Sequence, residues 1–304
     1  MNFEEDLKLQ FAGWLSANGY PGEGDLQTLV RRYRNITRRI PACIEWELQV
    51  SRNLAAKSLP KKIEKGLAHF MEQARGGADL RPFLSDKIDC ADYRDLMFYD
   101  WSIYHFHLGT KLAKEGKRRG FIEGTDDLLF AIADRETATM YLINTHPHEG
   151  GFTNQDLLRI IEENWPEILD RYTLHGVSPS YDGLSSEELG MLRSGGVNVV
   201  LRTPGGRTLA PMGGGITTDK SSFQDVRLAN HLAWRARQAE TEFQGGLASI
   251  LRYFRREHGL DSDRVSFRAQ LNAENTIRVG ETTTGTPVWN EREGWLITTI
   301  EVDL

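Results

Sequence analysis

Four of the eight histidines in this 304-residue chain lie between positions 105 and 148. His105 and His107 fall inside the short apolar run 103–108, and His146 and His148 follow the run 140–145. Side chains two positions apart on a β-strand point to the same face of a sheet. The spacing therefore predicts that His105 and His107 share one face. If the strand 140–145 pairs nearby, His146 and His148 join them at one rim.

Such a group of imidazoles supports two mechanisms. Histidine titrates near neutral pH, so one neutral and one protonated ring can act as base and acid in cleaving a phosphodiester, with a ribose 2′-hydroxyl as nucleophile and no metal. Alternatively, three imidazoles and Asp100 can bind Zn²⁺, Mn²⁺ or Fe²⁺ and activate a water molecule. A third interpretation is structural: Tyr104 and Phe106 point inward, and both histidines of that strand face solvent.

Charged residues flank the histidines on both sides. Asp100 lies five residues after Asp95, and its carboxylate can either orient a histidine tautomer or cap a local element. On the other side, Lys111, Arg118 and Arg119 form a basic arm. A guanidinium in this arm can hold a phosphate through two hydrogen bonds, and a solvated loop is the alternative.

A second basic region lies near the N-terminus. Residues 25–65 contain ten Lys and Arg against four Asp and Glu, a local net charge of +6, whereas the whole chain has a formal net charge of −6. Arg31 and Arg34 belong to this region. A basic face on an acidic protein is expected of a patch that contacts phosphates, and a solvated helix surface explains it equally well.

The elements that must position these residues predict an α+β fold with three consecutive parts. A mostly helical, basic leader covers residues 1–85, with helices at 3–19, 26–40 and 63–74 and a strand at 44–50. A central antiparallel sheet packed on helices covers residues 86–175, with strands at 103–108, 128–133 and 140–145. The last two strands form a hairpin, and a helix capped by Thr153 runs to Pro166.

The third part, residues 176–304, contains a β-hairpin, a long helix and a small antiparallel sheet. Ser185 and Glu188 are spaced as a capping box for a helix over 185–192. The hairpin strands are 197–202 and 207–211, and the long helix covers 222–257 with an interruption at Gly245 and Gly246. The sheet is expected from the segments 265–271, 276–279 and 296–302.

The bulk properties indicate a globular protein of the cytoplasm. The hydrophobic fraction is 39% and the charged fraction 26%, and the sequence has no apolar run of the roughly 20 residues that a membrane helix needs. The first residues do not resemble a signal peptide. Cys43 and Cys90 lack CxxC spacing, which predicts neither a disulfide framework nor a thiolate zinc site. No membrane partner is expected.

Two resemblances are carried by the central segment. The run 100–108 (DWSIYHFHL), with Leu128-Leu-Phe-Ala and Glu163-Asn-Trp-Pro, is similar to a family of uncharacterised bacterial proteins with a D-W-x-I-x-H-x-H-L core. The segments 128–132 and 141–146 resemble the strands of RelE/ParE-type endoribonuclease toxins, whose curved antiparallel sheet packs against helices. In place of that family's basic C-terminal segment this chain has Thr145-His-Pro-His, so no catalytic residue is transferred.

The leading hypothesis is a phosphodiester-cleaving enzyme, a metal-independent endoribonuclease of the bacterial toxin or phage-defence kind. His105 and His107 are its acid and base, His146 or His148 assists, and Arg118 or Arg119 holds the phosphate. It acts on nucleic acid, RNA in preference to DNA, needs no cofactor, and can have an inhibitory or complex-forming protein partner. One alternative is a hydrolase dependent on zinc or manganese at the same histidines. The other is a non-catalytic component of a defence or toxin–antitoxin system that binds nucleic acid or protein.

Overall fold

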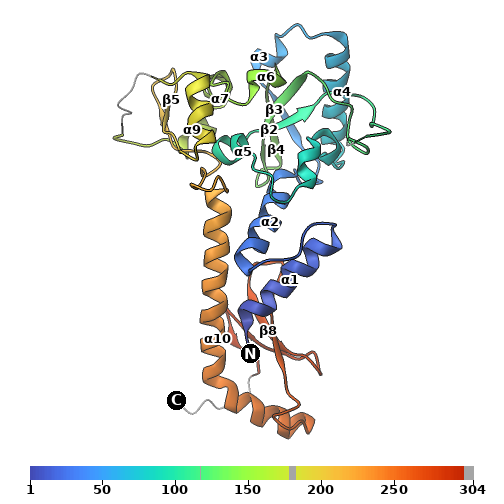
Figure 1. Cartoon of the computed structure of the whole chain (residues 1–304), viewed down its shortest axis with the longest axis vertical. Helices are drawn as coiled ribbons and strands as arrows, with labels where there is room; N and C mark the ends of the chain where they lie inside the picture. The colour runs from blue at the N-terminus through green and yellow to red at the C-terminus, as the bar shows by residue number, and fades with distance from the viewer. Residues whose placement is uncertain (117, 178–182, 298–304) are drawn as a thin grey trace. The chain divides into compact units, whose positions relative to one another are not determined.

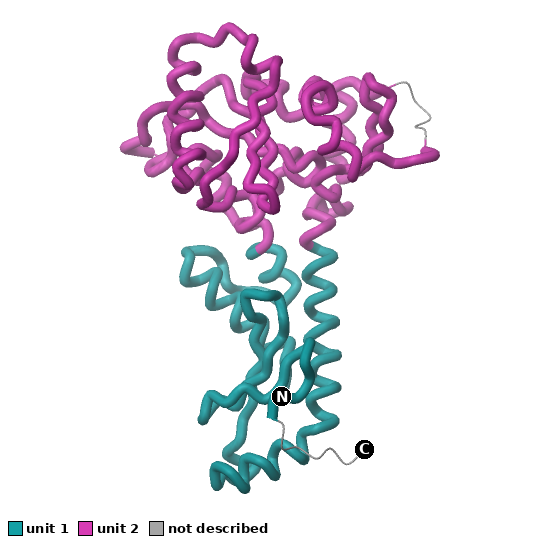
Figure 2. The backbone as a smooth tube through the Cα atoms, turned by 180° about the vertical axis from the view of Figure 1, so that it is seen from behind, with its two compact units in different colours: residues 1–33, 226–304 teal, residues 34–225 magenta. Residues whose placement is uncertain are grey.

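The computed structural model describes residues 1–116, 118–177 and 183–297, which form an α+β protein, as predicted. The chain divides into two compact units, residues 34–225 and residues 1–33 with 226–304 (Figure 2). The three consecutive parts expected from the sequence are therefore grouped differently. The first helix belongs with the C-terminal segment, and most of the predicted leader belongs with the central sheet.

The larger unit is built on a four-stranded sheet in the order β1-β4-β3-β2. Strands β2 (Tyr104–His107), β3 (Asp127–Asp134) and β4 (Thr139–Pro147) are antiparallel, and β3 and β4 form the predicted hairpin. Strand β1 (Glu47–Val50) pairs in parallel with β4. A purely antiparallel sheet was expected. The sheet is instead mixed, because the strand predicted at 44–50, in the leader, pairs in parallel with β4.

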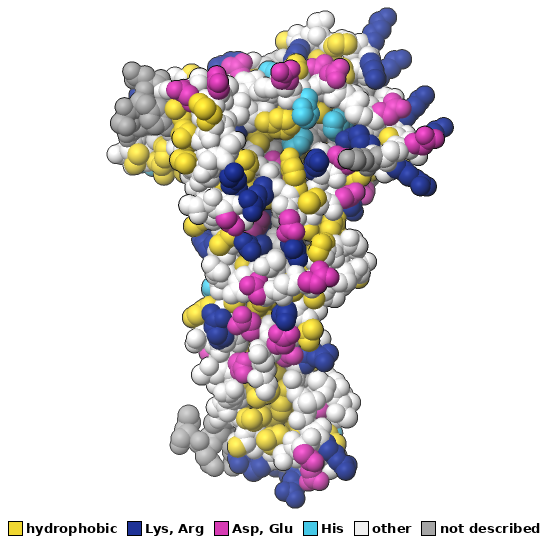
Figure 3. Space-filling model, viewed as in Figure 1, with side chains coloured by type: hydrophobic (Ala, Val, Ile, Leu, Met, Phe, Trp, Pro, Cys, Tyr) yellow, Lys and Arg dark blue, Asp and Glu magenta, His cyan; other side chains and the backbone are white. Residues whose placement is uncertain are grey.

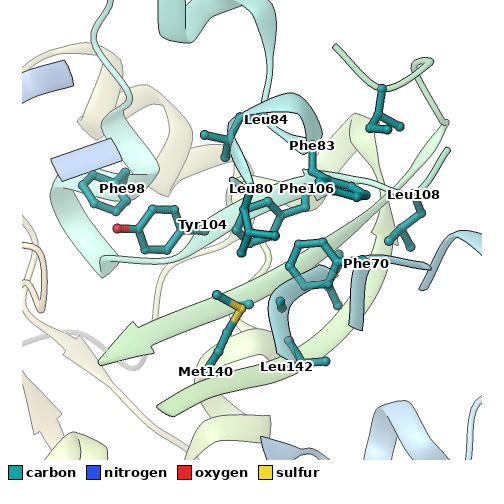
Figure 4. Packing of buried hydrophobic residues seen from close by; sticks show 14 of the residues in the cluster. Phe70, Leu80, Phe83, Leu84, Phe98, Tyr104, Phe106, Leu108, Met140 and Leu142 are labelled. Atoms are coloured by element: carbon teal, nitrogen blue, oxygen red, sulfur yellow. The ribbon is translucent and has the colours of Figure 1, made fainter. Parts of the chain in front are cut away.

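Helices cover both faces of this sheet (Figure 1). On one face, Phe106 and Met140 pack with Phe70 of helix α4 (Lys61–Arg75) in a continuous apolar cluster (Figure 4). On the other face, Leu128 and Phe130 pack against helices α5 (Leu96–Trp101) and α7 (Asp156–Asn164). Because side chains alternate along β2, its aromatic residues enter the first cluster and its histidines lie on the second face.

The covered second face corrects the solvent-exposed interpretation of the histidines. His107 is buried, with 8% of its surface exposed, and His105 is half-buried. The remaining short elements of this unit are α3 (Arg52–Ala55), η1 (Arg81–Phe83), η2 (Asp86–Asp89), α6 (His148–Gly151), α8 (Pro166–Asp170), β5 (Leu201–Arg202) and β6 (Thr208–Leu209).

Two of the predicted helix caps have different outcomes. Helix α9 (Ser186–Ser194) begins with the expected capping box, in which Ser185 and Glu188 bond to each other's backbone N–H groups. The predicted cap at Thr153 is wrong. Helix α7 begins three residues later, and the side-chain oxygen of Asn154 accepts the hydrogen bond from the N–H of Asp156.

The smaller unit contains helix α1 (Phe3–Ala17) and a sheet of β7 (Phe267–Leu271), β8 (Ile277–Glu281), β9 (Pro287–Asn290) and β10 (Gly294–Trp295). Helices α2 (Leu26–Arg39) and α10 (Phe223–His258) contain residues of both units. Helix α10 continues through Gly245 and Gly246, contrary to the predicted interruption. A Cβ on Gly246 would lie 2.1 Å from the Trp295 ring, so this glycine permits close packing.

Part of the predicted third strand of this sheet, residues 298–302, lies outside the described residues. The sequence did not predict β9, in which Pro287 reduced the strand signal. Among the helices of the described residues, none is long and apolar enough to cross a membrane.

Candidate active site

Three of the four central histidines line one pocket in the larger unit. His105 and His107 come from β2, and His148 follows the end of β4. The pocket has a volume of about 410 Å³, within the range of sites that bind small molecules or part of a polymer. Histidine side chains gather on one face beside Lys and Arg side chains (Figure 3).

The turn after β4 brings His148 to this pocket. The backbone N–H of His148 donates to the carbonyl of Asp126 at 2.7 Å, which holds the end of β4 beside the start of β3. Gly150 adopts φ +77°, a left-handed conformation that favours glycine, and lets the chain reverse. A Cβ on Gly151 would lie 2.8 Å from the Phe130 ring, so the chain can pass close over the sheet only with a glycine there.

Phe152, the next residue, lies between two of the imidazoles. Its ring is 4.9 Å from that of His105 and 5.0 Å from that of His148, at interplanar angles of 89° and 81°. Both contacts are edge-to-face, an arrangement that aromatic rings favour. Phe152 therefore orients a half-buried imidazole and an exposed one from two different segments.

His107 has a defined tautomer because of a single backbone contact. The N–H of Thr125 donates to Nδ1 of His107 at 3.2 Å, so Nδ1 is an acceptor and the neutral ring carries its proton on Nε2. Burial lowers the pKa of His107 to about 4, and the nearby cation of Arg118 acts in the same direction. At neutral pH His107 is thus an uncharged hydrogen-bond donor.

His105 is also held in its neutral form. Burial lowers the pKa of His105 below its ordinary value, more than the Asp95 carboxylate raises it. Among the described residues no group forms a hydrogen bond with Nδ1 of His105, which is buried. A neutral imidazole can accept a proton, which is the requirement for a general base; because Nδ1 is enclosed, a substrate can meet this ring only through Nε2.

His146 does not line this pocket, although it lies only two residues before His148. Its ring nitrogens are 3.1 and 3.3 Å from the side-chain nitrogen of Asn154. Burial and, secondarily, the cation of Lys57 lower the pKa of His146. Strand β4 ends at Pro147, so the two-residue periodicity that would have placed both histidines together does not continue to His148.

Asp100 contacts an arginine that the sequence analysis missed. Its carboxylate accepts a hydrogen bond from Nε of Arg193 at 2.7 Å, and both side chains are buried. Burial raises the pKa of Asp100, which the cation of Arg193 opposes. A role in orienting a histidine therefore has no contact to support it within the described residues. Leu189 lies one helical turn earlier on the buried face of α9, and that spacing was the available signal for Arg193.

The predicted phosphate-holding residues lie outside this pocket. Arg118 donates to the carbonyls of Leu84 and Ile122 and lies 4.0 Å from Asp86, so it stabilises the loop that follows β2. Lys111 and Arg119 are exposed on this loop. Of the two leader residues, Arg31 contacts Thr28 at 3.3 Å and Arg34 lines a different pocket, 3.9 Å from Asp225.

The arrangement of the imidazoles does not fit a metal ion. Across residues 1–116, 118–177 and 183–297, no group of three or more His, Cys, Asp or Glu side chains is placed to hold one. In addition, Nδ1 of His107 accepts the hydrogen bond from Thr125, and Asp100 is paired with Arg193. The ligand set expected for a zinc or manganese hydrolase is therefore not assembled by these residues.

No protein-family model matches the chain, and neither a curated protein nor a solved structure shows significant similarity to it. The site can therefore be described only by its geometry. It is a pocket lined by two neutral imidazoles, one exposed imidazole and several cationic side chains.

Proposed function

We propose that this protein is a metal-independent phosphodiester-cleaving enzyme that acts on RNA. The observation that supports this proposal is the convergence of His105, His107 and His148 on a pocket that is also lined by cationic side chains, Lys87, Arg94 and Arg193. Of two imidazoles in different environments, one can act as the general base and the other as the general acid, and cations attract a phosphate.

The environments of the histidines suggest their roles. His105, neutral because it is buried, removes the proton from a ribose 2′-hydroxyl, whose oxygen attacks the adjacent phosphorus. His148 has an exposed ring, and it gives a proton to the departing 5′-oxygen. The products are a 2′,3′-cyclic phosphate and a free 5′-hydroxyl. His107 was expected to be an acid or a base, and here it donates its Nε2–H to a phosphoryl oxygen instead.

The state of the two cysteines is consistent with a reducing cellular compartment. Cys43 and Cys90 are both exposed and free. Exposed free thiols are typical of proteins in the cytoplasm, where disulfides are rare. We place the activity there, with cellular or invading RNA as the substrate and the toxin or phage-defence role as the biological setting.

Cleavage of a fluorogenic single-stranded RNA in the presence of EDTA tests the proposal. Wild-type protein should cleave the RNA and leave a DNA of the same sequence intact, because DNA has no 2′-hydroxyl. His105→Ala and His148→Ala should each lower the rate by about 10²–10⁴-fold, the usual contribution of general acid–base catalysis. His175→Ala is the matched control, because His175 is an exposed histidine outside the pocket.

Two results would contradict the proposal. The first is equal cleavage by wild type and both pocket variants, which identifies a contaminating nuclease. The second is RNA binding that weakens with salt, survives both substitutions and is never followed by cleavage. That second result supports the non-catalytic alternative, in which the protein only binds nucleic acid.

A further inference from the structure

Arg193 is the most completely enclosed cation of the histidine pocket. Its side chain lies in the pocket wall with 4% of its surface exposed. Nε donates to Asp100 at 2.7 Å, and Nη1 donates to the backbone carbonyl of Phe152 at 2.5 Å. Among the described residues, the buried Nη2 has no hydrogen-bond partner. Buried polar atoms are nearly always paired, so an orphaned guanidinium nitrogen in a pocket wall indicates a ligand.

The guanidinium is also fixed in orientation. Its central carbon lies 4.0 Å from the centre of the Trp101 ring, and this stacking adds to the two hydrogen bonds. A donor that is held in place loses little conformational freedom when it binds a ligand. Asp100 balances the charge of Arg193. The guanidinium can therefore bind an anion mainly through an oriented, charge-assisted N–H group.

The rest of the pocket favours an anion that bears several oxygen acceptors. Lys87 and Arg94 are exposed cations in its lining, and His107 adds the Nε2–H group. The pocket also contains the carboxylate of Asp95, which caps helix α5 by accepting from the N–H of Phe98. Among the described lining residues, the three cationic side chains thus outnumber the one carboxylate, and donors are available from both β2 and α9.

We propose that this pocket binds a phosphate group through Nη2 of Arg193, and that this group is the scissile or an adjacent phosphate of the RNA substrate. The inference rests on the proposed function for the identity of the substrate. The phosphate site itself is defined by Arg193 and the pocket lining. It replaces Arg118 and Arg119, the phosphate-holding residues expected from the sequence.

The test is binding of inorganic phosphate, followed through the imidazole NMR signals of the uncleaved protein at constant pH. Arg193→Lys keeps the charge but removes the planar guanidinium, and should weaken phosphate binding by about tenfold or more. Gly190→Leu adds a side chain from the pocket wall. Among the described residues, a Cβ there meets only Cγ2 of Thr153, at 3.5 Å, so the helix tolerates it. This variant should weaken binding by a similar factor.

Gly245→Leu is the matched control, because Gly245 is an exposed glycine of α10 and no atom of the described residues lies within 4 Å of an added Cβ. It should bind phosphate as the wild type does. If Arg193→Lys does not fold, Gly190→Leu decides alone. Absence of saturable binding by the wild type overturns the inference, as does unchanged binding by Gly190→Leu.

The phosphate inference and the proposed function fail separately. If the wild type cleaves RNA but neither pocket substitution changes the affinity for phosphate, the proposed phosphate site is rejected and the cleavage function remains. If phosphate binding depends on Arg193 and Gly190 as expected but RNA stays intact, the anion site remains and the endoribonuclease function is wrong.

Discussion

The backbone N–H of Thr125 donates a hydrogen bond to Nδ1 of His107 across 3.2 Å, and this contact determines which nitrogen of the ring carries the proton. Protonation of Nδ1 would break the contact and place a charge in a buried position. Burial lowers the pKa of His107 from its ordinary 6.5 to about 4. An NMR titration should therefore show His107 changing charge near pH 4.

The same pKa difference predicts how stability depends on pH. Between pH 6.5 and 4 the unfolded chain binds a proton at His107 that the folded chain does not, so the free energy of unfolding falls as the pH falls. The total loss of unfolding free energy that His107 causes is about 3 kcal/mol, and it is complete below pH 4. His107→Asn, whose side-chain oxygen can still accept from Thr125, should remove this part of the pH dependence. Parallel urea-unfolding profiles for wild type and variant across that window would show that the prediction is wrong.

The Asp100–Arg193 pair predicts a large asymmetry between removing one partner and removing both. Asp100→Asn leaves a buried, uncompensated guanidinium and should lower the free energy of unfolding by about 3–5 kcal/mol. Asp100→Leu combined with Arg193→Met should recover much of that loss. Urea denaturation measures both changes.

An exposed ion pair is the control for this measurement. Arg256 and Glu257 are paired at 2.6 Å, but their side chains are 63% and 46% exposed. Glu257→Gln should therefore change the free energy of unfolding by less than about 1 kcal/mol. A loss at Asp100 no larger than the loss at Glu257 would mean that the buried pair is solvated in solution.

Local patterns in the sequence predicted the elements that carry the site. Alternation along 103–108 predicted that His105 and His107 share a face, and the Ser185–Glu188 spacing predicted the start of α9. Both signals act over a few residues. The pocket, however, also depends on Phe152 and Arg193, which reach it through turns and helix packing that no local pattern specifies. The grouping of residues 1–33 with the C-terminal segment is long-range in the same way.

The different positions of His146 and His148 were not predicted, although the sequence contains a signal for them. Their spacing of two residues predicts one shared face only if the strand continues through both. Strand β4 ends at Pro147, and the following turn directs His148 into the pocket while His146 meets Asn154. Proline removes a backbone donor and commonly ends strand pairing, so Pro147 was the available signal.

This divergence gives a direct comparison of the two neighbouring histidines. His146→Ala should leave the rate of RNA cleavage within about twofold of wild type, whereas His148→Ala should lower it by at least about 10²-fold. Both variants are measured with the same RNA in EDTA, after thermal unfolding shows that each is folded. The assignment of His148 as the acid is rejected if the larger loss occurs at His146.

Gly66 of α4 controls the position of the strand that carries His107. A Cβ added at Gly66 would lie 1.7 Å from the carbonyl oxygen of Leu108, the residue after His107, so the backbone must move. Gly66→Ala should therefore lower the free energy of unfolding by at least about 2 kcal/mol, although alanine favours helices. The matched control is Gly13→Ala on the exposed face of α1, where an added Cβ meets no atom within 4 Å in the part of the chain that the structure describes. It should raise that free energy by about 0.5–1 kcal/mol. If Gly66→Ala raises the free energy of unfolding as Gly13→Ala does, α4 does not pack against the end of β2 as closely as this contact requires.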